Sequence, residues 1–219
     1  MGTTFTGGAI TFLLLRICED MESQQEAWDS LYRGQDRPWR GVADISWMDI
    51  RAGDRVLELG CGNGKTAEAL LEKGAVVTGL DFSQAAVDSC ISRYGGKASF
   101  VKGDVRSLPF PDSSFDAVVA VHVLEHLTEE EFPGAVSEAL RVLRPGGRFY
   151  FRCFAEGDMR SDGKKEDVRN GIRYRYLSEE DILRAFSGAE RISLRLCEDP
   201  TRFGTVRRRF ECIFEKTQM

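Results

Sequence analysis

The stretch LELGCGNGKT, residues 57–66, joins a short apolar run to a glycine-rich turn, and it decides the fold class. Three kinds of nucleotide-handling site begin in this way. They are the phosphate-binding loop of NTPases, the dinucleotide-binding turn, and the turn that holds an adenosyl cofactor. The spacing of the glycines distinguishes among them.

The first two kinds of site fit this spacing poorly. A phosphate-binding loop needs the pattern G-x-x-x-x-G-K-[ST], and residues 64–66 match its end, but Leu59 stands where the first glycine belongs. The dinucleotide pattern G-x-G-x-x-G matches Gly60 and Gly62 but then has Lys65. That third glycine lets the helix pack closely on the strand, so a lysine is a real mismatch.

What remains is an alternating triplet of glycines, Gly60, Gly62 and Gly64, preceded by the acidic Glu58. Glycines allow the backbone to approach a ligand closely. A carboxylate at Glu58 would repel a pyrophosphate but would attract an ammonium group. The turn therefore favours a ligand that combines an adenosyl group with an amino acid and carries no phosphates.

Strands and helices alternate on both sides of this turn, which predicts a doubly wound α/β fold with helices on both faces of a mostly parallel, seven-stranded sheet. The last two strands are joined by residues 198–207 only, too few for a parallel crossover, so we expect the last strand to be reversed. The predicted strands cover residues 55–60, 75–81, 98–104, 115–123, 148–154, 191–197 and 208–216, and the predicted helices cover 65–73, 84–94, 128–143 and 178–187.

Acidic residues stand at or near the ends of three successive predicted strands. Glu58 precedes the glycine turn, Asp81 ends the second strand, and Asp104 ends the third. The carboxyl ends of parallel strands meet at one edge of the sheet, where open α/β folds bind their ligands. Asp81 lies about 20 residues beyond the first glycine, which is where a carboxylate accepts the ribose hydroxyls.

These motifs closely resemble those of the class I S-adenosylmethionine-dependent methyltransferases. The resemblance is carried by ELGCGNG at 58–64, by Asp81, by GDVRSLPFPDSSFDAV at 103–118 and by LRVLRPGGRFYF at 140–151. It covers residues 50–154 and implies that the cofactor S-adenosylmethionine places its methionine part on the glycine turn, its ribose on Asp81 and its adenine near Asp104. The cofactor-binding residues it implies are Glu58, Gly60, Cys61, Gly62, Asn63, Gly64, Asp81, Phe82, Asp104, Val105 and His122.

The segment that follows the fourth strand should line the reacting face. His122 is the candidate catalytic base, although it has an alternative role as a packed residue whose backbone carbonyl contacts the cofactor. The chain lacks the [DN]-P-P-[YF] motif at this position, which argues against methylation of amino groups on nucleic-acid bases. With two histidines and no C-x-x-C pair, no metal site is expected.

The acceptor is expected to be a small molecule bound by the variable parts of the chain. We expect residues 1–50 to form an N-terminal helical lid and residues 51–219 a Rossmann-like domain with a substrate insert at 155–177. Aromatic and basic side chains in these two segments suit an anionic or planar ligand. The candidate substrate residues are Tyr32, Arg33, Arg173 and Tyr174.

The net charge and the cysteine content limit which partners and which cellular location are expected. The net charge of −5 argues against DNA and anionic membranes as partners. The basic residues are concentrated at 141–219, which leaves an RNA or protein substrate as an alternative. A second alternative is a cofactor-binding protein that catalyses no transfer. Six cysteines without paired spacing indicate reduced thiols and a cytoplasmic protein.

The N-terminal region holds an apolar segment at 9–17 that is too short to span a bilayer. A fresh amphipathic helix is predicted to begin at Met21, and the sequence leaves open whether the natural chain starts there. The oligomeric state is likewise left open.

Overall fold

The computed structural model describes residues 24–34 and 41–217, so the apolar segment at 9–17 and Met21 lie outside the described part. Residues 24–34 are helical. The other helices are α2 (Lys65–Glu72), α3 (Gln84–Tyr94), α4 (Glu131–Val142) and α5 (Glu179–Ala185), with a short 3-10 helix η1 (Leu124–His126). The strands are β1 (Arg55–Leu59), β2 (Val76–Asp81), β3 (Ser99–Lys102), β4 (Phe115–Val121), β5 (Leu143–Phe154), β6 (Glu166–Arg169), β7 (Ile172–Arg175), β8 (Glu190–Pro200) and β9 (Val206–Glu215).

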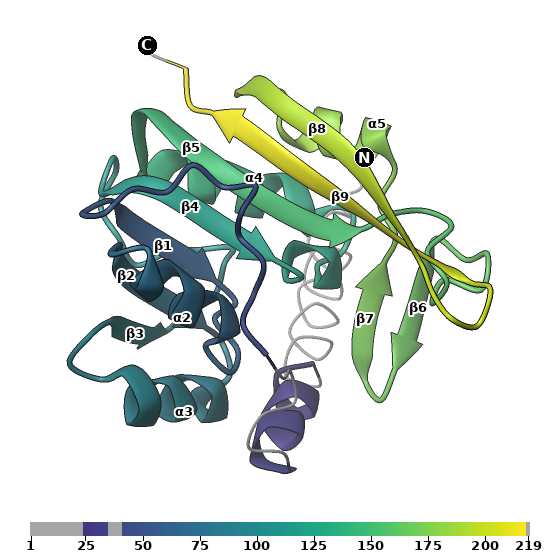
Figure 1. Cartoon of the computed structure of the whole chain (residues 1–219), viewed down its shortest axis with the longest axis horizontal. Helices are drawn as coiled ribbons and strands as arrows, with labels where there is room; N and C mark the ends of the chain where they lie inside the picture. Colours follow the sequence, from purple (N-terminus) through teal and green to yellow (C-terminus); the bar gives the residue numbers. More distant parts are fainter. Residues whose placement is uncertain (1–23, 35–40, 218–219) are drawn as a thin grey trace, which may run out of the picture.

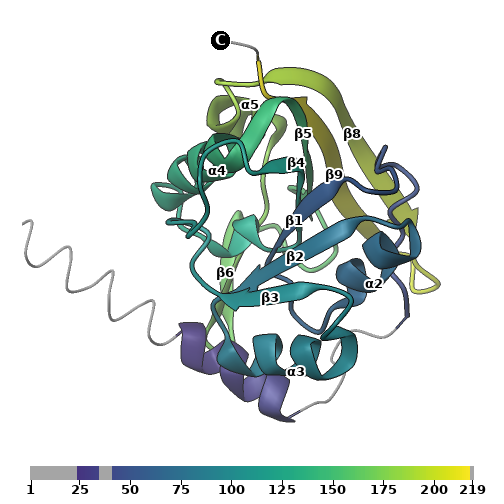
Figure 2. The ribbon, with the colours of Figure 1, turned by 90° about the vertical axis from the view of Figure 1, so that its left-hand side faces the viewer.

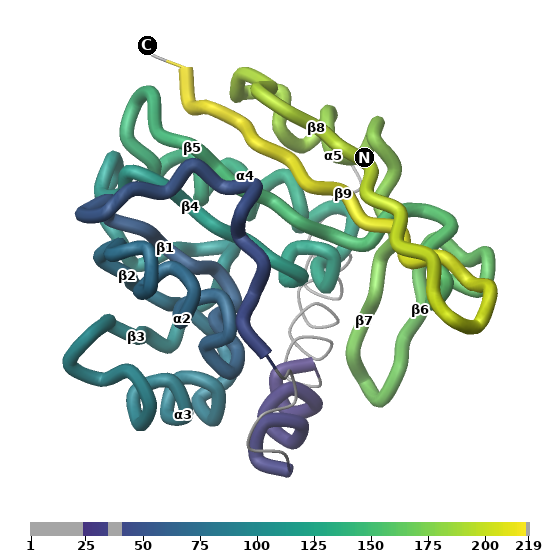
Figure 3. Tube along the Cα trace, viewed as in Figure 1, coloured from purple at the N-terminus to yellow at the C-terminus, as the bar shows by residue number. Residues whose placement is uncertain are grey.

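Seven of these strands form one sheet in the order β3-β2-β1-β4-β5-β9-β8 (Figure 1). Strands β1 to β5 pair in parallel, whereas β9 pairs antiparallel with both β5 and β8. The tube in Figure 3 shows β9 running between these two neighbours. The predicted seven-stranded sheet with a reversed last strand is therefore confirmed.

The sheet is covered on both faces because its central strands are apolar on both sides. In β4, Val118 and Ala120 belong to one core cluster, and Ala117 and Val119 belong to the other. Helices α4 and α5 cover the first face, while α2 covers the second (Figure 2). Residues 41–50 add Ile45, Met48 and Ile50 to the core beside α2.

Helices α3 and α5 carry the N-caps expected from the sequence, whereas α4 begins at Glu131, three residues after Thr128, with Glu130 as its N-cap. The side chain of Ser83 accepts a hydrogen bond from Ala86 N at the start of α3. Before α4, Thr128 Oγ1 accepts from Glu131 N at 3.2 Å, and Glu131 Oε2 accepts from Thr128 N at 2.9 Å. Ser178 forms a full capping box at α5. Each satisfies backbone donors that a helix leaves unpaired.

The predicted substrate insert at 155–177 has secondary structure of its own, because β6 and β7 form a two-stranded antiparallel hairpin. The turn is Asn170-Gly171, both with positive φ (52° and 77°), which is the type of dipeptide that two-residue hairpin turns prefer. The hairpin projects beside the carboxyl edge of the main sheet (Figure 1).

None of the helices in the described residues is both long and apolar enough to cross a membrane.

Candidate active site

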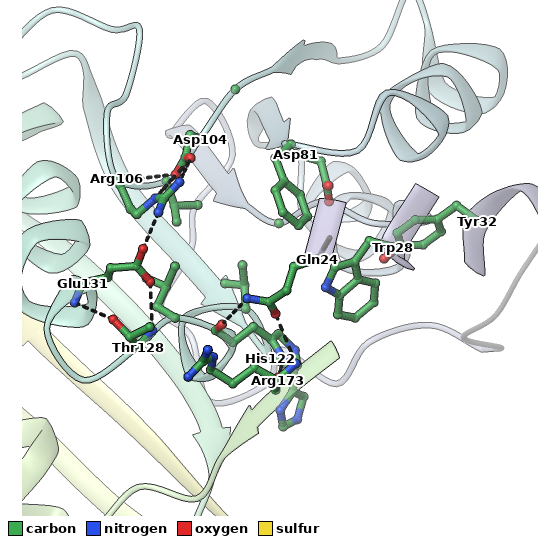
Figure 4. A pocket seen from close by; sticks show the side chains of 17 residues that line it. Gln24, Trp28, Tyr32, Asp81, Asp104, Arg106, His122, Thr128, Glu131 and Arg173 are labelled. Atoms are coloured by element: carbon green, nitrogen blue, oxygen red, sulfur yellow. Dashed lines mark hydrogen bonds and ion pairs between the residues drawn. The ribbon is translucent and has the colours of Figure 1, made fainter. Parts of the chain in front are cut away.

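A cavity of about 250 Å³ opens at the carboxyl edge of the parallel strands (Figure 4). The residues that directly follow or end β1, β2, β3 and β4 all contribute to its wall, as the strand topology predicts. Of the residues expected from sequence, those that line it are Tyr32, Gly60, Asp81, Phe82, Asp104, Val105, His122 and Arg173.

The glycine turn has the backbone conformation that its sequence requires. Gly60, Gly62 and Gly64 all have positive φ, at 64°, 50° and 77°. A Cβ atom on Gly60 would lie 2.5 Å from a methyl carbon of Val123, so a larger residue would overlap the chain after β4. The turn is therefore held in a left-handed path that brings its backbone against the cavity.

Asp81 connects the turn to the next strand. Its Oδ2 accepts a hydrogen bond from Gly62 N, and its Oδ1 accepts one from Ser83 N, both at 2.9 Å. Burial raises the pKa of this carboxyl to about 6, against the opposing effect of these backbone donors. A carboxylate has about four lone-pair sites, so Asp81 remains able to accept a hydroxyl donor from the cavity.

Glu58 lies beneath the turn and is only 3% exposed. Its Oε2 atom has no hydrogen-bond partner within residues 24–34 and 41–217. Burial raises the pKa of this carboxyl well above its ordinary range, and an ammonium group brought to the turn would stabilise the charged form. Cys61 and Asn63 are buried in the turn as well. Glu58, Cys61, Gly62, Asn63 and Gly64 lie outside the cavity wall.

The opposite end of the cavity holds an ionic cluster that the sequence did not reveal. Asp104 accepts hydrogen bonds from Arg106 Nε at 2.9 and 3.1 Å, and the Arg106 guanidinium also contacts Glu131. Although burial alone raises the pKa of Asp104, the hydrogen bonds from Arg106 hold it below its ordinary value. Asp104 is thus a fixed, charged acceptor at this edge (Figure 4).

The helix at residues 24–34 forms one side of the cavity. Gln24, Trp28 and Tyr32 recur every four residues, lie on one face of the helix, and line the cavity. The Tyr32 hydroxyl lies over the glycine turn, 2.7 Å from where a Cβ of Gly62 would be. The i, i+4, i+8 spacing was available in the sequence as a signal for this face, but it was not used, and Tyr32 was named only as an aromatic residue of the N-terminal segment.

Hydrogen bonds at Asp29 and at Gln24 tie this helix to the rest of the protein. Asp29 accepts hydrogen bonds from Ser83 Oγ and from Ala85 N, at the start of α3. Gln24 Oε1 accepts from Arg173 N at 3.1 Å, which ties the helix to β7. The helix therefore spans the cavity from the cofactor end to the hairpin.

Of the four candidate substrate residues, two lie off the cavity wall. The Arg33 side chain is 71% exposed and contacts Asp29. Tyr174 packs edge-on against His126, with ring centroids 4.9 Å apart, behind the wall. Tyr32 and Arg173 are the two that line the cavity.

His122 directly follows β4 and has a positive φ of 57°. Its Nδ1 is 2.8 Å from Oε1 of Glu125, and its ring stacks on Phe154 with centroids 4.3 Å apart. The Glu125 side chain is fully buried. Sequence reasoning had assigned no partner to His122, because the pairing depends on the turn of η1. The described residues contain no cluster of three or more metal-ligating side chains.

Comparison with known proteins agrees with this geometry. A family model described as "Methyltransferase domain" matches residues 57–151, from β1 to β5. Demethylmenaquinone methyltransferase of Paenarthrobacter aurescens is 35% identical over 127 residues, which are 58% of this chain and 49% of the relative. Residues 57–151 belong to the class I S-adenosylmethionine-dependent methyltransferase family. The chain spans about half the length of the curated methyltransferases that it matches first.

Solved structures of methyltransferases share the fold. A SAM-dependent methyltransferase from Methanosarcina mazei has a TM-score of 0.71 at 24% identity, covering 82% of this chain and 100% of that one. The 1,6-didemethyltoxoflavin-N1-methyltransferase of Burkholderia thailandensis has a TM-score of 0.63 at 16% identity, covering 100% and 94%. The latter was solved with 1,6-didemethyltoxoflavin and S-adenosylhomocysteine bound. At these identities the likeness is one of fold.

Proposed function

We propose that this protein transfers the methyl group of S-adenosylmethionine to a nucleophile on a small molecule. The observation that carries the proposal is the convergence of four strand ends on one cavity, with Gly60, Asp81, Asp104 and His122 on its wall. This is the site at which open α/β sheets bind ligands. Membership of the methyltransferase family supports the choice of ligand and reaction.

The residues present fit the cofactor in chemical type. The orphaned Oε2 of Glu58 suits the ammonium group of a methionine moiety, and the glycine turn permits its close approach. Asp81 would accept the ribose hydroxyls, since it lies on the cavity wall and a carboxylate accepts more hydrogen bonds than its backbone donors supply. Asp104 and the backbone of Val105 would contact the adenine. We assign Phe82, on the same wall, to the cofactor as well.

The chain contributes positioning and exclusion of water. When bound, the cofactor supplies an already activated methyl group on a sulfonium, so the protein has to align the acceptor for in-line displacement. Trp28 and Tyr32 line the cavity on the side away from Arg106 and Glu131 (Figure 4). We assign residues 1–50 the role of a lid and 51–219 that of the catalytic domain.

A small acceptor is favoured by the enclosure of the cavity. Its wall includes Arg173 of the β6–β7 hairpin and Gln24 of the helix, which are hydrogen-bonded to each other. We propose Tyr32 and Arg173 as direct acceptor contacts, with Arg33 and Tyr174 acting from outside the wall. An RNA or protein acceptor would have to enter past this bridge. We further propose a cytoplasmic location, on the basis of the reduced cysteines.

Calorimetric titration tests the cofactor assignment. The protein and its isosteric variant Asp81→Asn are each titrated with S-adenosylmethionine, S-adenosylhomocysteine, NAD and ATP. Binding of the two adenosyl ligands alone, weakened about tenfold or more in the variant, supports the proposal. If a folded sample binds neither adenosyl ligand, the proposal is wrong. Binding without methyl transfer to any acceptor would favour the non-catalytic alternative.

A further inference from the structure

His122 stands on the wall of the cavity and is hydrogen-bonded to a carboxylate that solvent does not reach. The Glu125 side chain is 0% exposed, whereas that of His122 is 28% exposed. Its Nδ1 lies 2.8 Å from Glu125 Oε1. The pair therefore runs from the interior of the protein to the surface of the cavity, with the imidazole at the cavity end.

A buried carboxylate is costly unless it is paired, and Glu125 has few partners. Within the part of the chain that the structure describes, its Oε2 atom makes no hydrogen bond, its Oε1 atom meets His122 Nδ1, and the buried His126 ring interacts with it electrostatically. An ionised Glu125 can only accept, and this arrangement places the proton of the neutral ring on Nδ1. The Nε2 atom is then left with an unprotonated lone pair, as a general base requires.

The backbone at His122 supports a functional role. Its φ of 57° lies in the left-handed region, which is strained for a residue other than glycine. The conformation is held by the hydrogen bond from His122 N to Arg152 O at 2.9 Å and by the stacking of the ring on Phe154. Strain of this kind persists only where surrounding contacts determine it, and it gathers at active sites.

The surroundings indicate the class of acceptor. Trp28 and His126 line the cavity and meet edge to face, with centroids 5.1 Å apart. Together with Phe154 behind His122, they give this end of the cavity an aromatic wall that suits a flat ring. A carboxylate acceptor is already ionised and an aryl amine has an available lone pair, so neither needs a base. A phenolic hydroxyl does need one, because its protonated oxygen is a weak nucleophile.

We propose that Glu125 positions His122 to take the hydroxyl proton of a phenol-type acceptor during methyl transfer. The oxygen–hydrogen bond breaks and the proton moves to His122 Nε2. The electron pair so released forms the new bond to the methyl carbon, and the carbon–sulfur bond returns its pair to sulfur. The imidazolium, stabilised by Glu125, then gives the proton to water. This proposal rests on the proposed function, since it names the acceptor of that same site.

The first test reads the tautomer and needs no acceptor. The chain has two histidines, so proton–nitrogen correlation NMR of histidine-labelled protein gives two imidazoles, and the variant His122→Asn identifies one by its loss. We expect the proton of neutral His122 on Nδ1. A proton on Nε2 overturns the proposal. This reading stands even if the protein binds no adenosyl cofactor, an outcome that would refute the proposed function separately.

The second test compares naphthol, naphthylamine and naphthoic acid of the same substitution as acceptors for the cofactor-loaded protein. We expect methylation of naphthol in preference to the other two. Glu125→Gln keeps the hydrogen bond but removes the charge, and should lower kcat about tenfold or more while KM and cofactor affinity stay within about twofold. His122→Ala should lose about a hundredfold or more, and added imidazole should restore part of it.

Other results of the second test would overturn the proposal. Preference for the amine or the acid, or full kcat in Glu125→Gln, overturns the proposal. A merely structural role for the pair would lower the folded fraction in both variants without rescue by imidazole. If none of the three probes reacts, the proposal is judged by the tautomer of His122. A proton on Nδ1 with an unprotonated Nε2 supports His122 as the general base, and a proton on Nε2 excludes that role.

Discussion

Gly60 and Gly53 stand at opposite ends of β1 and offer a matched pair for testing the glycine turn. Both have positive φ, 64° and 88°, so alanine at either position pays the left-handed penalty of about 1–2 kcal/mol. At Gly53 a Cβ would meet nothing within 4 Å. At Gly60 it would lie 2.5 Å from Cγ2 and 2.8 Å from Cβ of Val123.

The extra overlap sets the expected magnitude. Val123 meets the new atom with its own Cβ, so it cannot move aside by rotating a side chain, and the backbone after β4 has to shift. Overpacking of this kind costs about 1–3 kcal/mol. We therefore expect Gly60→Ala to lower the free energy of unfolding by about 2–5 kcal/mol in total, and Gly53→Ala by about 1–2 kcal/mol.

Urea denaturation without cofactor measures both values by linear extrapolation, with comparable slopes as the check on two-state behaviour. Calorimetry on the same samples should show weaker binding of S-adenosylmethionine to Gly60→Ala only, because Gly53 lies away from the cavity wall. Equal destabilisation by the two variants would mean that the turn does not approach the chain after β4, and the geometry of the site would be refuted.

Three further results are expected. The affinity for S-adenosylmethionine should fall about tenfold per unit below pH 6 in the unmodified protein and less steeply in Asp81→Asn, because only the charged form of Asp81, whose pKa burial raises to about 6, accepts the ribose hydroxyls; calorimetry in which Asp81→Asn shows the same pH profile would contradict this. Phe186→Ala should lower the free energy of unfolding by about 3–5 kcal/mol, because the ring is 1% exposed and stacks on Phe214 at 4.1 Å; urea denaturation measures it, and a loss under about 1 kcal/mol would refute the packing. Asp29→Ala removes the acceptor for Ser83 Oγ and should speed amide hydrogen exchange in residues 24–34 with little change in α4, as mass spectrometry can measure; unchanged exchange would show that this contact does not hold the helix.

The fold could be predicted from the sequence because the helix caps and turns agree with the alternation of strands and helices along the chain. The β4 sequence is apolar on both faces, Ser83 and Ser178 begin helices with the expected caps, and the short link before β9 forbids a parallel crossover. Each of these depends on residues close together in the chain. The hairpin of β6 and β7 also had a local signal, the Asn170-Gly171 dipeptide, which the many charges around it obscured.

The site could be predicted less completely because its key contacts join segments that are distant in the sequence. Asp81 could be placed at the end of β2, but its hydrogen bond with Gly62 depends on the path of the turn. Arg106 bridges Asp104 and Glu131 and so connects α4 to the end of β3. The burial of Glu125 beneath His122 depends on the packing of β5. The residue types were visible in the sequence, but the partners that give them their charge state were not.

The place of β9 in the sheet has a consequence for how the chain assembles. Its neighbours are β5, whose register begins with Arg148 opposite Glu215, and β8 on the outer side. Strand β8 follows β5 in the chain but has no hydrogen bond to it, so the outer part of the sheet cannot grow strand by strand. The β8–β9 hairpin is local in sequence and can close first, then dock as a unit through β9. Until β9 docks, the long edge of β5 is open to pairing with another chain. Slow docking of the β8–β9 hairpin would therefore favour aggregation.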